Sequence, residues 1–192
     1  MPVDLPGAHA RALANTARIV GGVSRDQLHD PTPDEDWDVE KLLQHIVSGN
    51  LWAVELTAGQ TIDEVGDRLD GDMLGDDPLG AYDASAQAAA AAFEVAGALD
   101  AQCAVSYGPV PGSVYAGHRF IDVLIHGWDL AIATGQDATL DSALVAACLA
   151  VVEPQAGLMQ ASGSYGSHVD APADADPQTR LLALLGRRPP HE

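Results

Sequence analysis

The chain has 192 residues, of which 47% are hydrophobic, so it is long and apolar enough to bury a core and is not an intrinsically disordered chain. Its 28 acidic residues outnumber 9 basic ones and give a formal net charge of −19, which argues against binding to nucleic acid or to anionic membranes. A solvated acidic surface explains this charge more simply than an acidic patch for a cationic partner.

The N-terminal part of the sequence predicts two long helices joined by a turn-rich connector. Apolar residues at helical spacing indicate a first helix over residues 5–23, stopped by the pair Gly21-Gly22. After the connector at 30–36, either Asp36 or Asp38 is a suitable N-cap for a second helix, which extends beyond residue 54. The acidic, glycine-rich segment 59–80 lacks the ligand spacing of an EF-hand calcium loop, so we expect a solvated loop there.

The C-terminal part predicts further helices. A third helix covers residues 78–99, a short extended piece follows at 103–110, and a fourth helix covers 111–133 and ends at Gly135. A fifth helix begins after Asp141 and reaches residue 159, a loop follows at 163–176, and a short helix covers 177–185. This pattern predicts an all-α fold, a four-helix bundle with short additional C-terminal helices, in a single domain over residues 1–192.

The fourth predicted helix carries a carboxylate and an imidazole four residues apart, at Asp122 and His126. This spacing is about one helical turn, so both side chains project from the same face. Most neighbours are Ile, Val, Leu and Trp, as is typical of a buried helix, and buried polar groups need partners. The two side chains could hydrogen-bond to each other, as polar pairs at this spacing commonly do, or they could bind a divalent metal.

His45 on the second predicted helix favours the metal interpretation. It lies at the flank of the apolar stripe, and Gly49 one turn later leaves room beside its ring. Helix bundles build metal sites from inward side chains of facing helices, so the sequence predicts a metal site formed by His45, Asp122 and His126. Two histidines and one carboxylate leave open coordination positions, as in catalytic zinc sites and in non-haem iron sites, and the spacing does not distinguish these metals.

The remaining histidines are assigned to other places. His118 is either a fourth ligand that closes the site or a pocket residue, and its separation of about 12 Å from His126 along the helix axis favours the pocket residue. The other four histidines lie in terminal or loop contexts and are predicted to be at the surface: His9, His29, His168 and His191.

Three tryptophans and two cysteines complete the set of candidate residues. Core packing is favoured for Trp37, Trp52 and Trp128, although the last two follow the histidine ligands closely enough to wall a pocket. Cys103 and Cys148 form no CxxC pattern, so two buried free thiols in a reducing cytoplasm are favoured over a disulfide. No apolar run reaches about 18 residues and the N-terminus lacks the pattern of a secretory signal, so we expect a cytoplasmic protein without a transmembrane helix.

Three segments of the sequence resemble a known family. They are Thr32-Pro33-x-x-x-Trp37-Asp38-Val39 with Leu42-Leu43-x-His45-Ile46-Val47, then Asp122-Val123-Leu124-Ile125-His126-Gly127-Trp128-Asp129-Leu130-Ala131, and the tail over residues 171–187. Together they resemble the actinobacterial metal-binding proteins of the DinB/YfiT-like superfamily. This group is close to the N-terminal domain of mycothiol-dependent maleylpyruvate isomerases.

The resemblance implies a four-helix bundle with one divalent metal, commonly zinc or nickel, and its metal motif maps onto His45, Asp122 and His126. The isomerase relatives usually have Glu at the position of Asp122, whose side chain is shorter but still able to ligate. Many relatives are expected to have Cys at the position of Asp34, so the resemblance implies no thiol role for this loop here. It also implies a homodimer.

The leading functional hypothesis is a mycothiol-dependent isomerase or S-transferase that acts on a small molecule. In it, a divalent metal, zinc first and nickel or iron as alternatives, holds the thiol as a thiolate. The rival hypotheses are a non-catalytic metal-binding module for stress response or sensing, and a metal-free helical bundle. Nucleotide-binding, serine-hydrolase and zincin functions lack support, because the sequence has no GxGxxG, P-loop, GxSxG or HExxH motif.

Overall fold

The computed structural model describes residues 3–34, 36–157 and 169–188. The chain divides into two compact units, one formed by Asp4–Ala138 and the other by Thr139–Glu192 with Met1–Val3, and each is described by itself. The single domain expected over residues 1–192 therefore stays a prediction. In the described part of the chain, no helix combines the length and apolarity needed to cross a bilayer.

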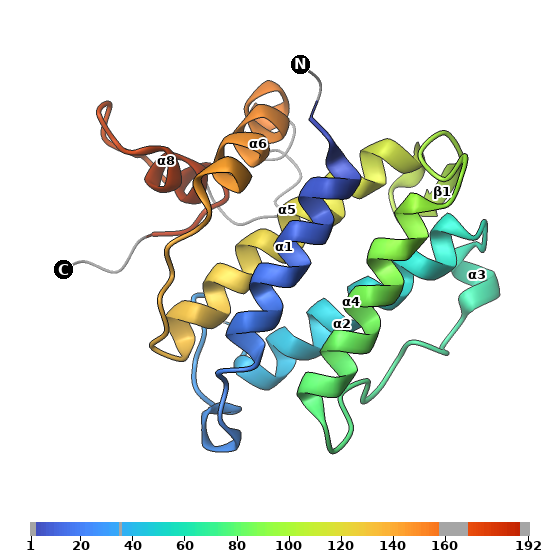
Figure 1. Ribbon diagram of the computed structural model, residues 1–192, viewed down its shortest axis with the longest axis horizontal. Coiled ribbons are helices and arrows are strands. Elements are labelled where there is room, and N and C mark those ends of the chain that lie inside the picture. Colours follow the sequence, from blue (N-terminus) through green and yellow to red (C-terminus); the bar gives the residue numbers. More distant parts are fainter. Residues whose placement is uncertain (1–2, 35, 158–168, 189–192) are drawn as a thin grey trace. The chain divides into compact units, whose positions relative to one another are not determined.

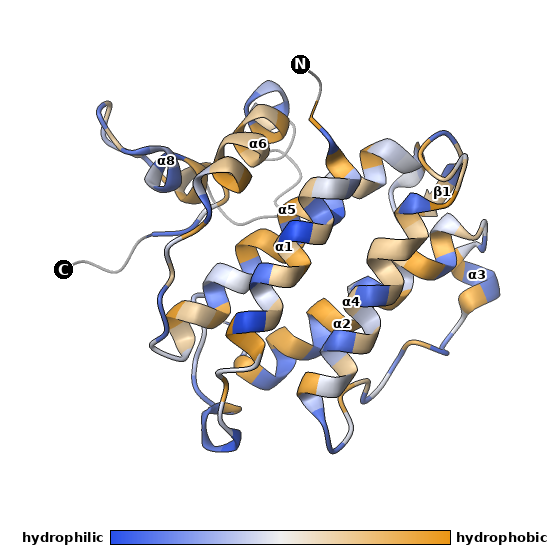
Figure 2. Ribbon diagram, in the orientation of Figure 1, coloured by the Kyte–Doolittle hydropathy of each residue, from blue (hydrophilic) through white to orange (hydrophobic). Residues whose placement is uncertain are grey.

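The larger unit is a bundle of four long helices (Figure 1): α1 (Leu5–Val20), α2 (Val39–Thr57), α4 (Pro78–Glu94) and α5 (Gly112–Ala133). Both α1 and α2 pack against α4 and α5, so the four helices enclose a common core. Hydrophilic and hydrophobic residues alternate along α1, α2 and α4 in Figure 2, as expected for helices with one buried and one exposed face. The predicted all-α, DinB-like four-helix bundle is confirmed.

Aspartate side chains define where three of these helices begin. Asp4, Asp38 and Asp77 each accept a hydrogen bond from the backbone N–H three residues later, at 3.2, 2.9 and 3.0 Å. Such caps satisfy backbone N–H groups that have no partner within the helix. Of the two caps proposed for the second helix, Asp38 is therefore the one that the structure uses.

Two helices of the larger unit end earlier than their sequence patterns predict. Helix α1 ends at Val20 instead of residue 23, and α4 ends at Glu94 instead of residue 99. After α4 the backbone of Val95 is extended, and Gly97 adopts a φ of +84°, a conformation that suits glycine and breaks the helical path.

The segments between the long helices contain short strands and short helices that the sequence pattern did not predict in this form. The extended piece predicted at 103–110 is an antiparallel hairpin of β1 (Gln102–Val105) and β2 (Gly108–Pro111). A 3-10 helix, η1 (Arg25–Gln27), follows α1, and a one-turn helix, α3 (Ile62–Val65), lies in the predicted acidic loop. Both helical pieces are too short to produce a readable hydrophobic period.

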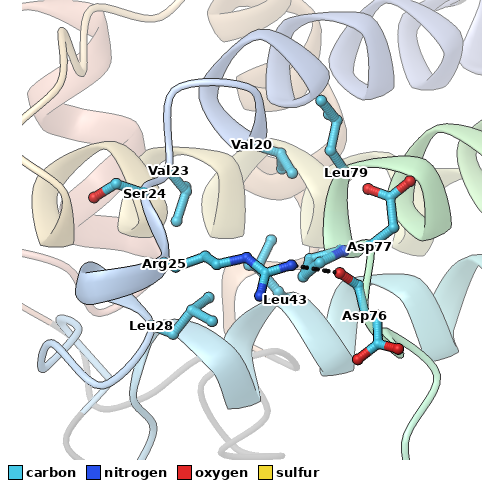
Figure 3. A pocket seen from close by; sticks show the side chains of 10 residues that line it. Val20, Val23, Ser24, Arg25, Leu28, Leu43, Asp76, Asp77 and Leu79 are labelled. Atoms are coloured by element: carbon cyan, nitrogen blue, oxygen red, sulfur yellow. Dashed lines mark hydrogen bonds between the residues drawn. The ribbon is translucent and has the colours of Figure 1, made fainter.

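The acidic segment after α3 is fastened to the bundle at two places. The Gln44 side chain on α2 donates to the Gly71 carbonyl and accepts from the Met73 N–H at 2.9 Å. Arg25 donates to the Asp76 carbonyl at 2.9 Å, across the mouth of a pocket of about 180 Å³ (Figure 3). This pocket has a mostly aliphatic lining, which includes Val20 and Leu43, and contains none of the predicted metal ligands.

The smaller unit contains α6 (Ser142–Val152), a 3-10 helix η2 (Glu153–Gln155) and α8 (Pro177–Leu184), with α6 packed against α8. Asp141 caps α6 and Pro177 occupies the first turn of α8, as predicted. An ion pair joins Arg180 to Glu153. The fifth helix predicted to reach residue 159 is interrupted, because α6 ends at Val152 and the 3-10 helix η2 with Pro154 follows; residue 159 itself and the first part of the 163–176 loop lie outside the described residues.

Helix α5 passes through the centre of the larger unit. It is buried along most of its length, and Phe120, Leu124 and Trp128 are among its almost fully buried side chains. Any polar side chain on the inward faces of this helix is removed from water and needs a partner inside the protein.

Candidate metal centre

The three predicted ligands meet between α2 and α5. The Oδ1 atom of Asp122 lies 3.3 Å from Nε2 of His45 and 3.6 Å from Nε2 of His126. One potential ligand atom from each of the three residues lies within 4.8 Å of the others, and His45, Asp122 and His126 are the only such group among the described residues. The structure thus brings the predicted residues together, while metal binding itself stays a prediction.

The spacing of these atoms suits a small divalent ion. In a tetrahedral zinc site with bonds of about 2.0–2.1 Å, neighbouring ligand atoms are about 3.3–3.4 Å apart. The observed separations of 3.3 and 3.6 Å are close to this value. The alternative of a simple hydrogen bond between Asp122 and His126 is disfavoured, because their 3.6 Å separation is longer than a normal hydrogen bond.

His126 is oriented by a second carboxylate. Its Nδ1 atom lies 3.0 Å from Oδ2 of Asp129, which is completely buried. Because a carboxylate accepts hydrogen bonds, Nδ1 carries the proton and Nε2 presents its lone pair toward Asp122 and His45. This carboxylate–histidine arrangement is the usual support of a metal-binding imidazole. Asp129 follows His126 by three residues, a spacing that places the two side chains on one helical face.

Arg119 is a member of the site that the sequence analysis did not identify. Its guanidinium Nη1 donates to Oδ2 of Asp122 at 2.9 Å, and its side chain is only 8% exposed. The space predicted beside the His45 ring at Gly49 is occupied by this guanidinium, since a Cβ atom at Gly49 would lie 2.5 Å from Nη1. An arginine three residues before an aspartate on one helix was the available signal.

Asp122 is held in its ionised form. Burial on its own would raise the pKa of this carboxyl, but the charge of Arg119, the neighbouring His126 and the hydrogen bond with His45 outweigh burial. The pKa of Asp122 is therefore well below its usual range. A carboxylate at neutral pH is the form that can bind a metal.

Trp37 forms one wall of the site. Its ring centroid lies 4.6 Å from that of His45 and 5.7 Å from that of His126. The sequence favoured the core for Trp37 because tryptophans usually pack there, and its position in the connector before α2 gave no helical spacing that could place it at the site. Trp128 does pack in the core, with 2% exposure, so it is no pocket wall.

A groove of about 650 Å³ lies next to His45. Trp37 and Trp52 line it together with Lys41, Ser48 and Asp70. Trp52 is partly exposed there, in agreement with the pocket role considered for it rather than with full core packing. The groove gives a small molecule access to one member of the three-residue group.

His118 stands outside this group. Its Nδ1 atom lies 2.5 Å from the hydroxyl of Tyr107, which comes from the β1–β2 turn. Burial lowers the pKa of His118. The structure therefore gives His118 a tyrosine partner and does not bring it to the other ligands as a fourth member.

The prediction of a surface position is wrong for His9. This residue of α1 is completely buried, its ring stands edge-on to Phe93 at 5.3 Å, and neither ring nitrogen has a hydrogen-bond partner. Burial lowers the pKa of His9 to about 3. His29 is exposed as predicted, and His168 and His191 lie outside the described residues.

Both cysteines are free and buried, as predicted. Cys103 lies in β1 and Cys148 in α6. Burial raises the pKa of both thiols, that of Cys148 to about 12. Neither is therefore a reactive thiolate at neutral pH.

Comparison with known proteins places the bundle in a family. The family model described as the mycothiol maleylpyruvate isomerase N-terminal domain matches residues 9–131, a range that contains all three members of the candidate metal group. Two relatives from Mycobacterium tuberculosis, uncharacterized protein MT0763 of strain CDC 1551 / Oshkosh and uncharacterized protein Rv0738 of strain H37Rv, are each 36% identical over 185 residues, which cover 94% of this chain and 96% of the relative. No solved structure gives a significant match. The chain belongs to the DinB-like family of mycothiol maleylpyruvate isomerase N-terminal domains.

Proposed function

We propose that this protein is a divalent-metal-dependent enzyme that activates a low-molecular-weight thiol, with zinc as the metal and mycothiol as the thiol. The observation that carries the proposal is the convergence of His45, Asp122 and His126 within 4.8 Å. Three protein ligands with a further open position are characteristic of catalytic zinc sites. Nickel and iron are the alternative metals, because imidazole and carboxylate ligands suit them as well.

Each side chain of the site has a distinct role in this proposal. His45, Asp122 and His126 act as ligands and not as general bases, since their facing atoms are directed at one another. Asp129 fixes the orientation of the His126 ring, and Arg119 keeps Asp122 ionised and in place. The bound metal would lower the pKa of a thiol and hold it as the nucleophilic thiolate.

The groove beside His45 is the proposed binding place for the thiol and its small-molecule substrate. Trp37 and Trp52 offer aromatic surfaces, while Lys41 and Ser48 offer polar contacts near the rim. Sites of this kind commonly combine apolar walls with a few polar groups that fix orientation. The reaction classes that this arrangement and the family name favour are isomerisation and S-transfer. We further propose a cytoplasmic homodimer with no nucleic-acid or membrane partner.

The proposal is tested by combining elemental analysis with calorimetry. Purified wild-type protein should contain about one divalent ion per chain, as expected for a single three-ligand site, and the metal-loaded form should bind mycothiol. His45→Ala should lose both properties, whereas the control His118→Ala should keep the metal because His118 lies outside the three-residue group.

Two outcomes would contradict parts of the proposal. Metal binding without mycothiol binding would favour a non-catalytic metal-binding module. Absence of metal from the wild-type protein, even after reconstitution with zinc, nickel or iron, would exclude the metal site altogether.

A further inference from the structure

We propose that Arg119 is a positioning residue that restricts Asp122 to binding the metal through one oxygen, and that it thereby keeps a coordination position free for the thiol. The inference rests on the proposed metal function. It concerns how many ligand atoms the protein supplies, which decides whether an outside ligand can bind.

The two oxygens of Asp122 already have different partners. Oδ1 faces the Nε2 atoms of His45 and His126, at 3.3 and 3.6 Å. Oδ2 accepts the hydrogen bond from Arg119 Nη1 at 2.9 Å. Charge-assisted bonds of this kind are among the strongest in proteins. Because the guanidinium engages one lone pair of Oδ2 and draws this oxygen toward Arg119, binding of the ion through Oδ1 alone is favoured.

Arg119 is itself held by a chain of buried polar groups. Its Nη2 lies 3.4 Å from Oδ1 of Asn50, whose Nδ2 donates to Oγ of Ser85 at 3.2 Å. The Ser85 hydroxyl in turn donates to the Tyr82 carbonyl at 2.9 Å. Asn50, Ser85 and Arg119 are all buried, so these contacts connect α5 through α2 to α4 within the core. The guanidinium is therefore also held by groups that do not belong to the metal group.

Gly49 provides the space that the guanidinium occupies. A Cβ atom at this position would lie 2.5, 2.6 and 2.7 Å from Nη1, Nη2 and Cζ of Arg119. Glycine is unfavourable in a helix interior, and Gly49 lies near the middle of α2. The close approach of Arg119 explains why glycine occupies this position. A Gly49→Ala substitution would therefore displace the guanidinium of Arg119 without removing its charge.

One-oxygen binding by Asp122 has a direct chemical consequence. Two imidazoles and one carboxylate oxygen supply three ligand atoms, so a four-coordinate ion retains one position for a thiol. Chelation by both oxygens would supply four and close that position. The positive charge of Arg119 also offsets the negative charge of Asp122, so that the bound ion attracts an anionic thiolate more strongly.

The test uses cobalt(II)-loaded protein, because the visible absorption of this ion reports its coordination number. Cobalt coordination is measured by visible and X-ray absorption, and affinity for an outside ligand by titration with 2-mercaptoethanol. Four variants are compared with the wild type: Arg119→Met, Gly49→Ala, Arg119→Lys and Glu40→Gln. Gly49→Ala displaces only the flexible end of Arg119. It therefore tests the role of Arg119 even if Arg119→Met does not fold. Glu40→Gln is the control, since Glu40 is an exposed residue of the same helix α2 and belongs neither to the lining of the groove nor to the metal group.

In Arg119→Met and Gly49→Ala, we expect cobalt to be bound by both oxygens of Asp122. These variants should bind 2-mercaptoethanol about 10–100-fold more weakly, the range of effects seen when residues that support metal ligands are substituted. Arg119→Lys, which retains a donor and its charge, should resemble the wild type, as should Glu40→Gln. Unchanged cobalt spectra and thiol affinity in Arg119→Met and Gly49→Ala would overturn the role of Arg119 alone. Failure of the wild type to bind cobalt would instead overturn the metal function on which it rests.

Discussion

His126 and His9 are both buried histidines of the same bundle, but their surroundings differ completely. His126 has a carboxylate near each ring nitrogen, with Asp129 at 3.0 Å from Nδ1 and Asp122 at 3.6 Å from Nε2. His9 has no hydrogen-bond partner at either nitrogen and contacts the ring of Phe93. Burial alone therefore does not indicate a metal ligand; the carboxylates around the imidazole do.

The difference also separates two effects on the protein. The groups around His126 form a preorganised site, so their effect is measured as the affinity for a ligand. The isolation of His9 affects stability, because a buried imidazole without partners resists protonation and loses the hydrogen bonds it would make with water. Substitutions at these two residues should therefore change different measurements.

The largest effect is expected for His126→Ala. Removal of a ligand atom should weaken zinc binding by more than about 100-fold, beyond the range seen for residues that only support a ligand. Competition with a chromophoric chelator measures the affinity. His9→Leu is the matched control, since it removes another buried histidine from the same bundle and should leave zinc affinity unchanged. Equal losses in both variants would mean that the effect arises from the fold and not from coordination.

A smaller loss is expected for Asp129→Asn. The amide oxygen can still accept from Nδ1–H of His126, but the negative charge that makes the imidazole a better ligand is gone. Zinc affinity should fall by about 10–100-fold. Retention of full affinity in this variant, measured by the same competition, would show that Asp129 has no part in supporting the site.

His9 should make the protein sensitive to acid. Its pKa is about 3 in the folded protein and 6.5 in the unfolded chain, so the unfolded state binds more protons between these values. The folded state is therefore stabilised above pH 6.5, and this stabilisation is lost as the pH falls toward 3. Between pH 6.5 and 4.5 the free energy of unfolding should decrease by about 2 kcal/mol through His9.

Urea unfolding of wild type and His9→Leu at several pH values isolates this contribution. His118, whose pKa burial also lowers, is present in both proteins and cancels in the difference. The depressed pKa of Asp122 makes the free energy of unfolding depend on pH mainly below 3.8, the pKa of this residue in the unfolded chain. That region lies outside the pH range of the test. Parallel pH profiles for the two proteins would contradict the assignment.

The smallest effect is expected for Trp37→Leu. Trp37 contacts both imidazoles through its ring, and such aromatic contacts contribute about 0.5–1.5 kcal/mol. Zinc affinity should fall by at most about tenfold, the equivalent of 1.4 kcal/mol. Trp52→Leu, which changes the groove without removing a ring from the two imidazoles, should leave zinc affinity unchanged. A larger loss for Trp52→Leu than for Trp37→Leu would reverse the assigned roles.

Local sequence patterns were sufficient for the fold and for two members of the candidate metal group, Asp122 and His126, while His45 on a separate helix was predicted from the way bundles build metal sites and from the family resemblance. The four long helices have clear periodicity, and the fourth carries Asp122 and His126 at a spacing that already places them on one face. Asp38 and Asp141 also mark helix starts at the sequence level, because capping acts within a few residues.

Contacts between distant segments account for what the sequence did not reveal. The burial of His9 is completed by Phe93 on another helix, and the close approach of Arg119 to Gly49 joins α5 to α2. Trp37 reaches the imidazoles from a connector without helical spacing. No local pattern contains these juxtapositions, since they depend on how the helices pack.

The most direct test of the central claim is the metal content of the purified protein measured together with that of His45→Ala. His45 is the ligand that comes from a separate helix, and its side chain is 35% exposed, so its loss should not unfold the bundle. The proposed site predicts about one divalent ion per wild-type chain and almost none in His45→Ala. Equal metal content in the two proteins would contradict it.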